Sequence, residues 1–152
     1  MPDSYDELLE SLALPNTHIP AGKDLALEVI VLRAHLLIER QVKRVVEDRF
    51  LKPKAYDLSR TKFSAALRLA EALYGDQLPL WVWRAIQELG IIRNSLAHQL
   101  TDELLERRVQ KLIKMVSENE PTYSDRNGSA LENLKQCANI LHSSLLILLH
   151  LT

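Results

Sequence analysis

The chain has 152 residues, 20 acidic and 19 basic side chains and a formal net charge of −1, so one domain is the default and no overall positive field indicates a nucleic-acid binder. Hydrophobic residues make up 47% and charged residues 26%, which is typical of a globular domain large enough to bury a core. The single cysteine, Cys137, excludes an internal disulfide, fits a reducing compartment and is expected to pack in the core.

Neither a secretory leader nor a membrane span is predicted. The first residues are polar and acidic and lack the apolar segment of a signal peptide. The apolar run at 140–151 contains two His and two Ser and is shorter than the roughly 20 residues that a bilayer requires. We therefore expect a cytoplasmic protein without membrane contact, in which 140–151 is a core or dimer-interface helix.

Helical periodicity dominates the chain from its beginning. A capping box at Ser4 opens a short helix that Pro15 ends, so residues 1–22 are expected to form an N-terminal helix and linker ahead of a domain at 23–152. A long helix is predicted at 24–49, and its two apolar stripes predict burial around much of its first half. The first stripe is Leu25, Val29, Leu32 and Leu36, and the second is Val31, Ala34, Ile38, Val42 and Val45.

Two helices are predicted in the middle of the chain, after a loop at 51–57. Ser59 or Thr61 is expected to cap the first, and Gly75 to end it. Pro79 stands ahead of the second, at 80–98. Their expected core positions are Phe63, Ala66, Leu67, Ala70 and Leu73 on the first, and Val82, Ile86, Leu89 and Leu96 on the second.

Two more helices complete an all-α antiparallel bundle of about five or six helices. One begins at Thr101 or Asp102, and the other is capped by Ser129 after a polar loop at 121–128. Their expected core positions are Leu105, Val109, Leu112 and Val116 on the first, and Leu134, Ala138, Leu141, Leu145 and Leu148 on the second.

The segment Arg-Asn-Ser-Leu-Ala-His at 93–98 is unusual because it follows an apolar run that should be buried. Arg93 lies four residues after Leu89, on the apolar stripe, and a buried arginine requires a partner. Glu39 continues the line of Leu32 in the long helix, so it either lies at the rim of the core or pairs with Arg93.

Arg93 and His98 are separated by about 140° on an ideal helix, so one straight helix cannot direct both side chains at one atom. They converge if the helix frays near Ala97, or if two copies of the helix pack across a two-fold axis. The segment therefore predicts a homodimer. The simpler alternative is structural: Arg93 pairs with a carboxylate and His98 caps a helix end.

The order of these features resembles the HEPN superfamily of all-helical domains, over roughly residues 24–152. The long helix carries Glu39, a helix with Phe-Ser-Ala-Ala-Leu-Arg-Leu-Ala at 63–70 follows, and the next helix ends in an arginine, a polar residue and a histidine. The segment is also similar to that of the mannitol-repressor (MltR-like) regulators.

The HEPN resemblance implies a metal-independent ribonuclease that acts as a dimer, such as a toxin or phage-defence component restrained by an antitoxin. Arg93 and His98 would be catalytic, with Asn94 and Glu39 in support. Histidine suits acid–base chemistry near neutral pH, and arginine suits stabilisation of a charged phosphorus centre. The mannitol-repressor resemblance implies instead a non-catalytic transcriptional regulator or protein-interaction module.

No cofactor or metal is expected, because the five histidines are scattered without metal-ligand spacing. Two further features of the sequence each allow two interpretations. Trp81 and Trp83 either stack on bases or belong to the core or a dimer interface. A local basic cluster is either a solvated helix end or a docking site for an RNA backbone. It consists of Arg49 and the four candidate RNA contacts Lys43, Arg44, Lys52 and Lys54.

Overall fold

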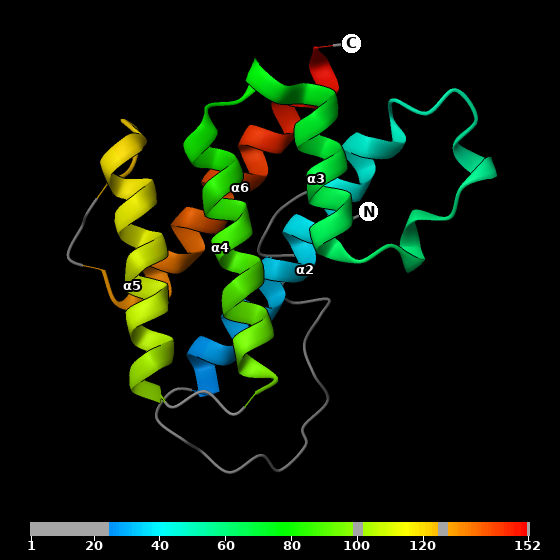
Figure 1. Ribbon diagram of the computed structural model, residues 1–152. Coiled ribbons are helices and arrows are strands. Elements are labelled where there is room, and N and C mark those ends of the chain that lie inside the picture. The colour runs from blue at the N-terminus through cyan, green and yellow to red at the C-terminus, as the bar shows by residue number, and fades with distance from the viewer. Residues whose placement is uncertain (1–24, 99–101, 125–127, 152) are drawn as a thin grey trace.

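The computed structural model describes residues 25–98, 102–124 and 128–151, and these ranges contain helices and no strand (Figure 1). The prediction of an all-α bundle is confirmed. The α-helices are α2 (Leu25–Glu47), α3 (Phe63–Tyr74), α4 (Leu80–Leu96), α5 (Asp102–Asn119) and α6 (Ala130–His150). Short 3-10 turns are η1 (Pro53–Ala55), η2 (Leu58–Arg60) and η3 (Gly75–Gln77).

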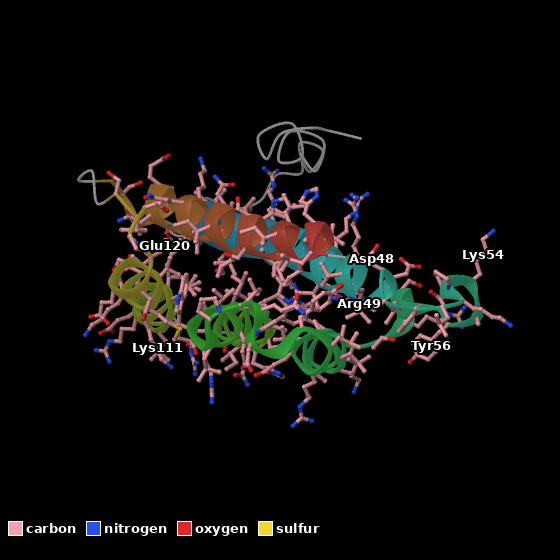
Figure 2. The ribbon with its side chains drawn as sticks, turned by 90° about the horizontal axis from the view of Figure 1, so that it is seen from above. Asp48, Arg49, Lys54, Tyr56, Lys111 and Glu120 are labelled. Carbon is pink, nitrogen blue, oxygen red and sulfur yellow. The ribbon has the colours of Figure 1, made fainter. Side chains whose placement is uncertain are left out.

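Helix α4 lies at the centre of the bundle and contacts each of α2, α3, α5 and α6. It runs antiparallel to its sequence neighbours α3 and α5, as their short connections predict (Figure 1). Helices α2 and α6 form the most extensive pair and run in the same direction (Figures 1 and 2). None of the helices in the described ranges meets the length and apolarity of a membrane span. The predicted helix near residue 4 and the domain boundary after residue 22 lie outside the described residues.

The core forms where the predicted stripes of α4, α5 and α6 meet. Every predicted core position of α5 and α6 is buried, and so is Cys137. On α3, Tyr74 is buried in place of the exposed Leu73, and its hydroxyl donates to the backbone oxygen of Val45 (2.7 Å). The α3 stripe is therefore rotated slightly from the predicted one.

The two apolar stripes of α2 have different environments. Ile38 and the rest of the second stripe are fully buried, whereas Leu32 is 41% and Leu36 is 51% exposed. The prediction that burial extends around much of the first half of α2 is therefore wrong. The reason is that α3, α4 and α6 all contact α2 on the side of the second stripe, and no described element covers the first.

The predicted helix ends are mostly confirmed. Gly75 ends α3 with a φ of 39°, which favours glycine, and the Ser129 hydroxyl accepts from the Glu132 amide (3.3 Å) at the start of α6. The predicted cap of α3 by Ser59 or Thr61 is wrong, because Lys62 precedes that helix without a side-chain cap.

The exposed and buried stripes of α2 give a matched pair of variants. We expect Ile38→Ala to lower the free energy of unfolding by about 2–5 kcal/mol, because it leaves a cavity in the core. We expect Leu36→Ala to change it by less than about 1 kcal/mol. Urea unfolding of both variants measures the difference, and equal losses would show that the Leu36 stripe is also packed.

Candidate functional site

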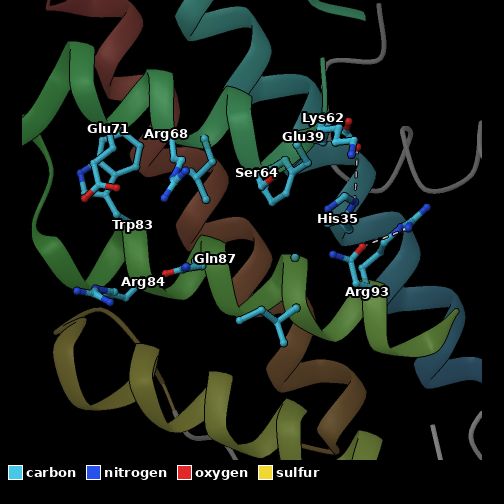
Figure 3. Close-up of a pocket in the computed structure, with 15 residues that line it drawn as sticks. His35, Glu39, Lys62, Ser64, Arg68, Glu71, Trp83, Arg84, Gln87 and Arg93 are labelled. Carbon is cyan, nitrogen blue, oxygen red and sulfur yellow. Dashed lines mark hydrogen bonds and ion pairs between the residues drawn. The ribbon is translucent and has the colours of Figure 1, made fainter. Parts of the chain in front are cut away.

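A groove of about 610 Å³ lies between α3 and α4, and α2 closes one end of it. Arg68, Glu71 and Arg84 lie toward the open end, and His35 and Arg93 lie at the α2 end (Figure 3). Asn94 also lines the groove, as do Glu39 and Lys62. The structure thus brings three of the predicted site residues, Glu39, Arg93 and Asn94, to one cavity.

Arg93 is exposed in the last turn of α4, which corrects the expectation that the apolar stripe buries it. Its Nη1 donates to Asn94 Oδ1 (3.4 Å), and no carboxylate within the described ranges forms an ion pair with it. The alternative in which Arg93 is a structural ion-pair partner therefore finds no support in these ranges. The guanidinium lies at the α2 end of the groove, and its hydrogen-bond partner among the described residues is Asn94.

Glu39 has other partners than Arg93. Its Oε1 accepts from Lys43 Nζ (2.8 Å), and its Oε2 lies 3.7 Å from Nδ1 of His35. These three side chains follow one another at four-residue intervals on α2, where side chains stack on one face. Lys43 Nζ also donates to the backbone oxygen of Ser59 (3.4 Å). The network therefore connects the groove wall to the α2–α3 connection.

His35 is only 4% exposed, and this burial is the main cause that lowers the pKa of its imidazole below the ordinary 6.5. Glu39 opposes the shift, while the charges of Arg93 and Lys43 add to it. His35 is consequently neutral at neutral pH, with one ring nitrogen able to donate and the other able to accept.

A close approach between α3 and α4 fixes the ring of His35. Phe63 packs edge-on against it, with ring centroids 4.6 Å apart and an interplanar angle of 70°. A Cβ atom on Gly90 would lie 2.7 Å from Cε1 of Phe63. A glycine inside a helix costs about 1 kcal/mol relative to alanine, and this contact is the physical reason for Gly90 in the middle of α4.

His98 lies beyond the groove. Helix α4 ends at Leu96, two residues earlier than predicted, and the amides of Ala97 and His98 donate to the backbone oxygens of Asn94 (3.2 Å) and Ser95 (3.1 Å). These bonds close a tighter turn of the i to i+3 type. His98 is exposed and does not line the groove, so one chain alone does not gather Arg93 and His98 in this cavity.

The predicted basic cluster is divided. Lys43 is half-buried in its pair with Glu39, whereas Arg44 is exposed. The pKa of His142 on α6 is lowered mainly by the burial of its own imidazole, and the charge of Arg44 adds to that shift. Lys52 and Lys54 are exposed in the α2–α3 connection, which projects from the bundle on the side away from Lys111 of α5 (Figure 2). The four cations do not form one patch.

The tryptophans belong to the core, which excludes the stacking interpretation for Trp83. Its side chain is 3% exposed and its indole Nε1 donates to the backbone oxygen of Gly75 (3.2 Å). Trp81 is half-buried against the same core.

Burial raises the pKa of the Cys137 thiol to about 12, so this thiol is not a nucleophile near neutral pH.

The sequence analysis missed the cations of the groove, Lys62, Arg68 and Arg84. A partial signal was present, because Arg84, Gln87 and Asn94 share one face of α4 and Ser64, Arg68 and Glu71 share one face of α3. Neither spacing shows that the two faces meet.

In the described ranges, no group of three His, Cys, Asp or Glu side chains could hold a metal ion.

The Gly90–Phe63 contact predicts a non-additive pair of substitutions. We expect Gly90→Ala to destabilise the protein despite the better helix propensity of alanine, because the new methyl group displaces the Phe63 ring. In a Phe63→Leu background the same change should cost at least about 0.5 kcal/mol less. A double-mutant cycle of chemical unfolding measures the coupling, and additive effects would contradict the close contact.

The lowered pKa of His35 predicts a pH dependence of stability. At a pH between the lowered pKa of His35 in the folded protein and 6.5, the unfolded chain binds more protons at this residue than the folded chain does. The contribution of His35 to the free energy of unfolding is therefore fully present above pH 6.5 and is lost as the pH falls. We expect His35→Gln to reduce this dependence without abolishing it, because His142 shifts in the same direction. Unfolding curves from pH 7.5 to 5 compare the two proteins, and identical pH profiles would show that His35 is not the titrating group.

Comparison with protein-family models, with curated proteins and with solved structures finds no match to this chain.

Proposed function

We propose that this protein is a metal-independent endoribonuclease of the HEPN type that acts as a homodimer. The observation that supports the proposal is the environment of the Arg93 guanidinium. This group is exposed at the end of a groove, without a carboxylate partner in the described ranges. A guanidinium in this state is suited to bind a phosphate, because its planar donors match two phosphate oxygens.

The reaction that the resemblance implies needs only the chain's own side chains. The 2′-hydroxyl of RNA attacks the adjacent phosphorus, and the bond from phosphorus to the 5′ oxygen breaks. One histidine accepts the proton of the 2′-hydroxyl, and a second donates a proton to the departing 5′ oxygen. The products are a 2′,3′-cyclic phosphate and a 5′-hydroxyl, so atoms and protons balance without an added oxidant or metal.

In this proposal each side chain has a separate role. His98 of each subunit exchanges protons, and Arg93 stabilises the negative charge that develops on the phosphate oxygens. Asn94 accepts from Arg93 through Oδ1, which leaves its amide hydrogens for a phosphate oxygen. Glu39 acts at a distance, because it lies between His35 and Lys43 and orients the wall behind Arg93.

The dimer follows from the position of His98. In one chain His98 lies past the end of α4 and outside the groove. If two copies pack with these helix ends facing one another, both histidines and both arginines line a shared cleft. The proposal therefore makes the homodimer the active form, and a protein that covers this end, such as an antitoxin, would inhibit it.

A non-catalytic regulator of the mannitol-repressor type is the second candidate. The separation of His98 from the groove within one chain favours it, and so does the net charge of −1. In that case Arg93 and Asn94 would contact a partner protein, and no RNA would be cleaved.

The test compares Arg93→Ala and His98→Ala with the unaltered protein on single-stranded RNA in the presence of a chelator. We expect each variant to lose at least about 100-fold in cleavage rate, while its free energy of unfolding changes by no more than about 0.5 kcal/mol because both side chains are exposed. Lys114→Ala, an exposed cation of α5, is the control and should retain full activity.

The outcomes separate the two candidates. Detection of cyclic-phosphate ends supports the ribonuclease. Folded Arg93→Ala and His98→Ala variants that cleave at the normal rate would contradict it. Absence of cleavage by a dimer of the unaltered protein would favour the regulator.

A further inference from the structure

The α3–α4 groove carries an excess of positive charge. Its lining contains four Lys and Arg side chains and two Glu side chains, and Lys43 already neutralises one of the two, Glu39. The four cations are all exposed, and within the described ranges none of them forms an ion pair with a carboxylate. They are Lys62, Arg68, Arg84 and Arg93.

Three of the four cations of α5 provide the contrast; the fourth, Arg108, is half-buried and forms no ion pair within the described ranges. Arg107 pairs with Glu103 (2.9 Å), Lys111 with Glu88 (3.1 Å) and Lys114 with Glu118 (3.8 Å). A carboxylate partner must be displaced before a phosphate can bind, so a paired cation attracts a polyanion less than an unpaired one. Of these two basic surfaces, the groove is therefore the one with more unpaired cations available to an external anion.

The dimensions of the groove fit a strand rather than a single ion. Arg84 and Arg93 are nine residues apart on α4, which is about 13.5 Å along the helix axis and about half a turn around it. Both side chains still line the groove, at its two ends, and Arg68 and Lys62 extend the charge along α3. The distance along the axis exceeds the spacing of successive phosphates in one strand. A volume of about 610 Å³ lies in the range of small-ligand pockets, so the groove holds only a short part of a strand.

The floor of the groove lacks an exposed aromatic ring for base stacking. Trp83 is buried, and Phe63 is half-buried against His35. Polar groups along the sides come from Ser64, Gln87 and Asn94, which suit phosphate and sugar oxygens. Such a surface recognises the backbone of a strand and carries little base specificity.

We infer that the α3–α4 groove holds the backbone of single-stranded RNA, with Lys62, Arg68 and Arg84 binding the phosphates that flank the one at Arg93. This inference rests on the proposed function, since it names the substrate path to the same site. It assigns binding to cations that lie outside the segment at 93–98, and it gives Glu71 the opposite role of limiting the affinity.

The test is a binding titration of the full chain with a short, labelled, single-stranded oligoribonucleotide whose 2′-hydroxyls are methylated, so that it cannot be cleaved. We expect Arg68→Gln and Arg84→Gln each to weaken binding by about fivefold. Each should also reduce the slope of log affinity against log salt by about 0.7. Glu71→Gln should tighten binding by about threefold, an effect of opposite sign that general destabilisation cannot produce. Lys114→Gln, at a paired cation of α5, should bind normally.

The results distinguish this inference from the proposed function. Weaker RNA binding by the groove variants supports the inference that the groove binds RNA, even if the unaltered protein cleaves no RNA. In that case only the ribonuclease proposal fails. The inference about the groove would be overturned if Arg68→Gln, Arg84→Gln and Glu71→Gln all bind RNA as the unaltered protein does. If cleavage still depends on Arg93 and His98, the ribonuclease proposal would stand. Equal affinity for a duplex of the same sequence, or a preference for polyglutamate over the oligoribonucleotide, would also overturn the inference about the groove.

Discussion

The central position of α4 is the constraint on which the rest of the structure depends. This helix contacts every other α-helix of the described ranges, so most of its circumference must be apolar, as Val82, Ile86, Leu89 and Ile92 are. Few positions remain for polar side chains. Glu88 is buried and pairs with Lys111 of α5, and the exposed polar face forms one wall of the groove. In the last turn of α4, Leu96 still packs against the core, whereas Arg93 is exposed at the groove, so its charge does not carry the cost of burial.

The other wall depends on how closely α3 approaches α4. The absence of a side chain at Gly90 lets the Phe63 ring rest on α4, and the ring in turn holds His35 of α2 edge-on. Glu39 and Lys43 extend this contact to the α2–α3 connection. The shape of the groove therefore depends, through these packing and electrostatic contacts, on the absence of a side chain at Gly90 in the middle of α4.

The sequence predicted the stripes of α5 and α6 correctly because each of these helices has one apolar face, and a single face can meet the core in only one way. Helix α2 has two apolar stripes, and periodicity alone does not reveal which one its neighbours cover. Arg93 was expected to be buried because it continues the line of Leu89, but it lines the groove between α3 and α4, while the neighbouring Ile92 stays in the core. Glu39 and Arg93 were singled out from their spacing and Asn94 from the resemblance of the segment at 93–98, whereas Lys62, Arg68 and Arg84 required knowledge of which faces of α3 and α4 meet.

The pairing of α2 with α6 has a consequence for how the chain folds during synthesis. The two helices are on the order of 100 residues apart in sequence, yet they form the most extensive contact of the bundle, and such distant contacts slow folding because a long loop must close first. Until α6 has left the ribosome, the apolar side of α2 has lost its largest partner and stays exposed to other chains. During most of the synthesis of this chain, the apolar side of α2 is therefore the kind of transiently exposed surface that makes folding intermediates prone to aggregate.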